Sequence, residues 1–175
     1  MRYLLHSPFE IYLRIIFSMF VGIIIGFERA IYHKPAGVRT FSLVCMGSTL
    51  IMLISAYGAD YLGLKESFDP FRIAAQIVSG IGFIGAGVIW NGENGAKHGI
   101  TTASELWVVS AMGMALGVGM YDLVILLMIC IFLVMRIGNM LERYADAKNK
   151  VKSEFSDMEL IDIELTAKKS QMDEL

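Results

Sequence analysis

The sequence has only two cysteines, Cys45 and Cys130, and each lies in an apolar run. A lone cysteine in such a run is normally a small apolar filler. We therefore predict neither a disulfide framework nor a thiolate metal site. Positive charge is scarce too, because 15 Lys and Arg stand against 17 Asp and Glu, a net charge of −2. That balance provides no basic surface for nucleic acid.

The usual sequence signals of catalysis are also missing. The chain has no Ser/His/Asp order, no paired carboxylates at helical spacing and no phosphate-binding loop ahead of a lysine. The run Gly80–Gly87 has glycine spacing like that of a nucleotide loop, but it lies in an apolar segment with no preceding strand. We predict a protein that is not an enzyme, with no catalytic residues, no cofactor and no metal ligands.

Apolar residues are abundant instead. They make up 55% of the chain, and the mean hydropathy is +0.58, so lipid must replace water around much of the surface. A helix that crosses a bilayer needs about 20 mainly apolar residues. The sequence thus predicts an all-α integral membrane bundle of about five transmembrane helices, with a tight hairpin between the last two. The predicted spans are residues 11–27, 40–57, 71–90, 103–120 and 123–135.

Charge placement predicts the orientation and the domain boundary. With five spans, and counting Lys and Arg as far as Lys152, nine fall on the side of the C-terminus and four on the other side, which favours N-outside, C-inside. Half of the 32 charged residues follow position 135. We therefore expect a membrane domain over residues 1–143 and a polar cytoplasmic tail over residues 144–175. Within the tail, residues 158–166 alternate partly at period two, which fits a strand. The alternatives are a helix, a disordered end and a remnant of a larger soluble domain.

Small residues recur at helical spacing in three of the predicted spans. Such pairs let helix backbones approach closely in lipid. They favour ordinary contact within one bundle, with a dimer face as the alternative. For a homodimer we expect the face formed by Gly113 and Gly117. The predicted packing residues are Gly22, Gly26, Gly82, Gly85, Gly113 and Gly117.

Three separated motifs carry a resemblance to a known family. They are Gly26-Phe-Glu-Arg29 with Pro35-Ala-Gly-Val-Arg-Thr40, the run from Asp69 to Gly87, and Gly99–Trp107. In this order they resemble the membrane domain of the MgtC/SapB family, over residues 22–122. The resemblance implies a multi-pass protein of the bacterial inner membrane, linked to growth at low magnesium, acid tolerance and survival inside host cells.

The resemblance also implies a choice between two functions. One is regulation of other membrane proteins in magnesium or acid stress, and the alternative is transport of Mg²⁺ or another cation. Many members carry a cytoplasmic ACT-like domain, and the stretch after Arg143 is too short for it. Glu105 departs from the small or neutral residue that is more common there. We expect the bilayer and another membrane protein as partners.

Polar residues from three interhelical regions should meet at the inner level of the bundle. We predict a Glu28–Arg39 ion pair as one of two alternatives, the other being charges that fix helix depth. Thr102 and Glu105 fit a capping box at a helix start. We name the whole set the inner polar cluster. Its members are Glu28, Arg29, Arg39, Thr40, Asn91, Thr101, Thr102 and Glu105.

A second polar group is expected at the outer end of the third span. Asp69 and Pro70 are a preferred N-cap and a preferred first helical residue. Arg72 and Gln76 continue along one face, with Ser79 next. Polar side chains in a membrane helix usually point inward. We therefore expect Arg72, Gln76 and Ser79 to make interhelical hydrogen bonds, with a permeation path or a recognition face as the alternative. The predicted outer polar stripe consists of Asp69, Arg72 and Gln76.

Overall fold

The computed structural model describes residues 8–63, 69, 71–92 and 95–173. The described chain divides into two units, residues 1–128 and 129–175, which are treated separately below. Its helices are α1 (Pro8–Ile31), α2 (Val38–Tyr61), α3 (Ala74–Gly87), α4 (Ile100–Val118) and α5 (Tyr121–Asp173), with a hairpin of β1 (Trp90–Asn91) and β2 (Lys97–His98).

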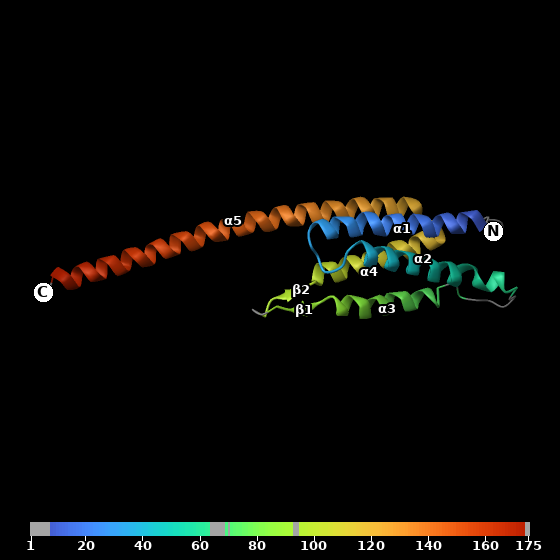
Figure 1. Cartoon of the computed structure of the whole chain (residues 1–175), viewed down its shortest axis with the longest axis horizontal. Helices are drawn as coiled ribbons and strands as arrows, with labels where there is room; N and C mark the ends of the chain where they lie inside the picture. Colours follow the sequence, from blue (N-terminus) through green and yellow to red (C-terminus); the bar gives the residue numbers. More distant parts are fainter. Residues whose placement is uncertain (1–7, 64–68, 70, 93–94, 174–175) are drawn as a thin grey trace. The chain divides into compact units, whose positions relative to one another are not determined.

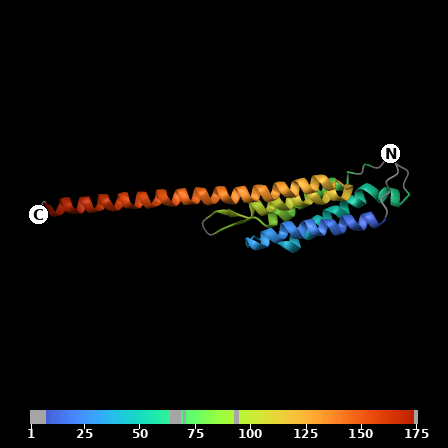
Figure 2. The same ribbon diagram turned by 90° about the horizontal axis from the view of Figure 1, so that it is seen from above.

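In the first unit, α1 to α4 lie alongside one another and alternate in direction (Figures 1 and 2). Helix α2 packs extensively against both α1 and α4, whereas α3 packs on α4 and more lightly on α2. The antiparallel hairpin, in which Trp90 pairs with His98, lies at the end where α1 finishes and α4 begins. We call this the hairpin end. The core between α1, α2 and α4 includes Ile25, Phe41 and Leu106, which are fully buried.

The packing glycines account for the close approach of these helices. A Cβ at Gly22 or Gly26 would come within 3.0 Å of the α2 backbone. A Cβ at Gly113 would come as close to the Cys45 carbonyl oxygen, and one at Gly117 as close to the Met52 side chain. These four glycines therefore lie in contacts within one bundle, and Gly85 has ordinary contact with Ala103.

Two details of the glycine prediction are wrong. Gly82 is exposed and has open space around it, so it does not pack against a described helix. The face of Gly113 and Gly117 is buried against α2, so a second copy cannot use it. A homodimer itself stays a prediction.

Hydroxyl groups on α2 add specific bonds to this packing. Ser48 Oγ lies 2.9 Å from Ser110 Oγ of α4, and Thr49 Oγ1 lies 2.9 Å from the Gly113 carbonyl oxygen. The start of α3 is tied to α2, because Ala74 N–H donates to Ser55 Oγ at 3.2 Å. Bonds of this kind are worth about 0.6 kcal/mol each on average in a membrane protein.

The helix lengths confirm the all-α membrane bundle, but the bounds of the individual helices differ from those of the predicted spans. Three described helices are long and apolar enough to cross a membrane, over Phe9–Ile31, Val38–Ala59 and Tyr121–Asn149. Helix α3 has only 14 residues, because the chain forms a turn at residues 71–73 and leaves the helix before Trp90 to build the hairpin. The hairpin after α4 is confirmed, since Gly119 adopts φ +86° and α5 begins at Tyr121. Orientation across the bilayer stays a prediction.

The second unit consists of the continuation of α5. The helix has no break at residue 144, where the tail was predicted to begin, and it ends at Asp173. The strand and the disordered end considered for residues 158–166 are therefore wrong, and the helical alternative holds. The division into a membrane domain and a tail stays a prediction.

Candidate functional site

A buried ion pair lies near the hairpin end of the first unit. Arg29, in the last turn of α1, places its Nε 2.9 Å from Oε2 of Glu105 on α4. The two side chains are each only 4% exposed. Neither oxygen of Glu105 receives a well-aligned hydrogen bond from a described group, so the attraction between the two charges dominates this contact.

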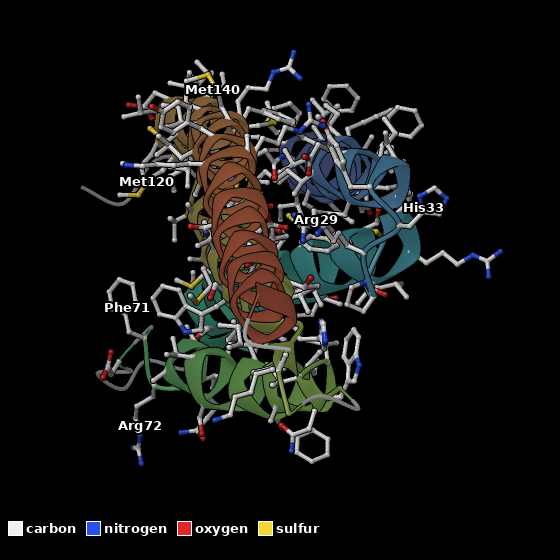
Figure 3. All side chains as sticks on the ribbon, turned by 90° about the vertical axis from the view of Figure 1, so that its left-hand side faces the viewer. Arg29, His33, Phe71, Arg72, Met120 and Met140 are labelled. Atoms are coloured by element: carbon white, nitrogen blue, oxygen red, sulfur yellow. The ribbon has the colours of Figure 1, made fainter. Side chains whose placement is uncertain are left out.

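Thr102 completes this group, which we call the Arg29 cluster. Arg29 Nη2 donates to Thr102 Oγ1 at 3.1 Å. Thr102 is buried, and it lies one turn before Glu105 on the same face of α4. Figure 3 shows Arg29 pointing into the bundle. A guanidinium group can satisfy a carboxylate and a hydroxyl at once because its N–H donors lie in one plane.

The predicted capping box is wrong. Helix α4 begins at Ile100, and its N-cap is Gly99, which has φ +87° and no side-chain capping bond. Thr102 and Glu105 therefore lie inside the helix, where they face Arg29 instead of the helix start.

The predicted Glu28–Arg39 pair is also wrong. Arg39 is exposed, Glu28 is half-buried, and no bond between them occurs in the described part of the chain. Neighbours on a helix point in different directions, and it is Arg29, not Glu28, that faces the interior. Of the other members of the inner polar cluster, Thr40 is half-buried and Asn91 is exposed on β1.

A cavity of about 250 Å³ opens beside the Arg29 cluster at the hairpin end. Its walls come from the loop after α1, the hairpin and the first turn of α4. Thr101 and Thr102 line it with Arg29, so the structure brings these three predicted residues together. His33, Lys34, Trp90 and His98 also line it, and the sequence prediction did not include them.

The opposite end of the bundle contains a second buried arginine, which the sequence prediction missed. Arg14 is 1% exposed, and its Nη1 donates to the Gly117 carbonyl oxygen at 2.7 Å and to Tyr57 Oη at 3.2 Å. Its Nη2 lies 2.8 Å from Glu10 Oε1. The spacing of four residues between Glu10 and Arg14 is the sequence signal that could have indicated a paired, inward-facing arginine.

The outer polar residues do not point inward as expected. Asp69 is not an N-cap of α3 but accepts from Phe71 N–H at 2.9 Å within a turn, and Pro70 lies outside the described residues. Arg72 and Gln76 are exposed, and Figure 3 shows Arg72 pointing away from the bundle. The described residues offer neither side chain an interhelical hydrogen bond, so that prediction is wrong.

An apolar groove of about 600 Å³ runs between α2 and α3, with α4 at its floor. Gly47 of α2 and Gly80 of α3 both line it, and a Cβ at either glycine would meet open space. Gln76 and the hydrogen-bonded pair Ser48 and Ser110 supply its polar atoms.

The fold and these sites define a multi-pass helical membrane protein in which a buried arginine is paired with a carboxylate near each end of the bundle. The sequence profile of the MgtC family matches residues 15–144, and the chain belongs to that family. The resemblance noted from the motifs is therefore confirmed.

Three relatives illustrate the match. The chain is 48% identical over 116 residues to the "Putative magnesium transporter YhiD" of Escherichia coli K12, covering 65% of this chain and 54% of that protein. It is 35% identical over 114 residues to "Protein SapB" of Bacillus subtilis, covering 64% and 49%. It is 40% identical over 103 residues to "Protein MgtC" of Brucella abortus, covering 59% and 40%. The chain thus spans about half the length of these curated relatives, and no solved structure matches it.

Proposed function

We propose that this chain is a non-enzymatic regulator in the bacterial inner membrane that acts in adaptation to low magnesium or acid. It works by helix–helix contact with another membrane protein. The observation that carries the proposal is the groove between α2 and α3, which the described residues of the chain leave open.

The composition of the groove suits a transmembrane helix of a partner. Helices associate in lipid through close backbone contact, and glycine allows this contact. Gly47 and Gly80 provide it from two different helices, while Leu43, Ile51 and Ile84 supply apolar walls.

The polar residue of the groove supports the same occupant. Gln76 is exposed on α3, and its side-chain amide has no hydrogen bond within the described chain. This amide can hydrogen-bond to a polar group on a partner helix, which the apolar walls of the groove cannot offer.

Cation transport, which the name of the Escherichia coli relative suggests, is supported less well. The buried carboxylate of Glu105 is neutralised by Arg29 at 2.9 Å. Arg14 is a second buried positive charge. Mg²⁺ in proteins is usually held by one or two carboxylates with waters. The described residues contain no group of three or more His, Cys, Asp or Glu side chains suited to a metal ion.

The test fills the groove without disturbing the bundle. Gly47→Leu with Gly80→Leu adds side chains into open space, so the protein should reach the membrane in normal amounts. It should lose the partner captured by crosslinking in native membranes, and it should fail to restore growth at low magnesium.

Gly82→Leu is the matched control, because Gly82 is also exposed with open space but does not line the groove. This variant should behave like the unchanged protein. Normal growth and crosslinking by the groove double variant would contradict the proposal. Saturable Mg²⁺ uptake by liposomes that contain the purified protein would favour transport instead.

A further inference from the structure

We propose that the cavity at the hairpin end binds a phosphate group, either as the headgroup of an anionic lipid or as free phosphate. This site is separate from the groove, since its walls come from the α1–α2 loop, the hairpin and α4. The inference therefore does not depend on the proposed partner.

The charge of the cavity wall favours an anion. Among the described residues that line it, Arg29 and Lys34 are charged, His33 and His98 add imidazole groups, and none is acidic. Glu105 already offsets Arg29, and Glu28 on α1 is half-buried nearby in sequence without lining the cavity. Lys34 therefore adds a second positive charge to the described lining of the cavity. A lysine ammonium is a common phosphate ligand.

The start of α4 adds donors to the same cavity. Thr101 and Thr102 lie in its first turn and line the cavity. The backbone N–H groups of a first turn have no acceptor within their helix, and here no side chain caps them. Such N–H groups and the positive end of the helix dipole favour an anion.

His33 occupies a left-handed backbone conformation that glycine adopts at a lower free-energy cost. His33 has φ +51°, just past the end of α1. Its N–H donates to the Ala30 carbonyl at 3.1 Å, and Lys34 N–H donates to the Arg29 carbonyl at 3.1 Å. This is the Schellman helix ending, whose left-handed position is usually glycine. A histidine there costs backbone free energy that glycine would not, yet it supplies an imidazole to the cavity wall.

Trp90 and Tyr32 indicate at which level of the bilayer the cavity lies. Trp90 stacks on His98 with ring centroids 5.5 Å apart, and both residues line the cavity with Tyr32. Trp and Tyr gather where a membrane protein meets the lipid headgroups. A cavity at that level is accessible both to headgroup phosphates and to dissolved phosphate.

The experiment uses the full chain in dodecyl maltoside, a detergent that contains no phosphate. Inorganic phosphate is titrated at constant ionic strength and followed by phosphorus NMR. In a second arm, native mass spectrometry compares retention of phosphatidylglycerol with that of diacylglycerol, which lacks the phosphate. Binding in the first arm identifies free phosphate as a ligand, and selective retention in the second identifies the headgroup.

Three variants make either result specific. Lys34→Gln removes the ammonium, and His33→Gly removes the imidazole while keeping the left-handed backbone. Each should weaken binding by about ten-fold, as expected for the loss of one charge-assisted hydrogen bond. Lys97→Gln removes a lysine of β2 that does not line the cavity, and it should change nothing.

Saturable binding in either arm that weakens in Lys34→Gln and His33→Gly but not in Lys97→Gln supports the proposal. Absence of phosphate binding together with equal retention of the two lipids overturns it. Equal losses in Lys34→Gln and Lys97→Gln also overturn it, because the binding would then follow overall charge and not the cavity.

Discussion

The Arg29–Glu105 pair predicts a specific pattern of stability among three variants. Arg29→Gln and Glu105→Gln each leave one charge buried without its partner. At an effective dielectric constant of about 20, charges about 4 Å apart attract by about 4 kcal/mol. Removing one partner of a buried pair typically costs about 3–5 kcal/mol. We expect each single variant to lose about that much free energy of unfolding.

The double variant Arg29→Gln/Glu105→Gln should recover most of this loss. It leaves no uncompensated charge, and two amides can hydrogen-bond across the same gap. Replacing a buried ion pair as a whole is often nearly neutral. The three variants and the unchanged protein together form a double-mutant cycle, which isolates the coupling between the two residues.

The assay is unfolding of the purified protein in detergent, followed by circular dichroism and by the fraction that elutes as folded protein. Arg39→Gln is the control, because Arg39 is exposed and a surface substitution changes stability by about 0.5 kcal/mol or less. Additive losses in the double variant would refute the reasoning, since they would mean that the two charges do not stabilise each other.

Two further predictions concern the packing of α1 and α4. Arg14→Gln should lower the free energy of unfolding by about 1.5–3 kcal/mol, because a charged hydrogen bond to the buried Gly117 carbonyl is lost; an unchanged unfolding midpoint would contradict the buried position of Arg14. Gly113→Ala should lower the free energy of unfolding by about 1–3 kcal/mol, because the added Cβ would overlap Cys45. Gly82→Ala, at an open position, should be neutral in the same unfolding assay, and equal effects of the two alanines would show that the α2–α4 contact is not tight.

Much of the fold could be predicted from hydropathy, because a bilayer requires long apolar helices. The third helix was predicted too long, since the apolar residues before Ala74 and after Gly87 build a turn and lead into the hairpin. Apolar composition alone does not distinguish a helix from such connections.

The site was harder to predict than the fold. The spacing within the sequence indicates that Glu28 and Arg29 point in different directions, but it does not say which one faces α4. That choice depends on the rotation of α1, which is set by the close contact of Gly22 and Gly26 with α2. For the same reason the burial of Arg14 follows from the arrangement of three helices.

The two buried arginines hold α1 and α4 in one register. Arg14 bonds to Gly117, and Arg29 bonds to Thr102, so fifteen residues separate the contacts on each helix. A slide of α1 by one helical turn, about 5.4 Å, would break both attachments together. Helices α1 and α4 should therefore move as one rigid body. Helix α2 should move with them, because close glycine contacts hold it against both helices. Helix α3 packs more lightly on α2, and motion within the bundle is most easily accommodated there.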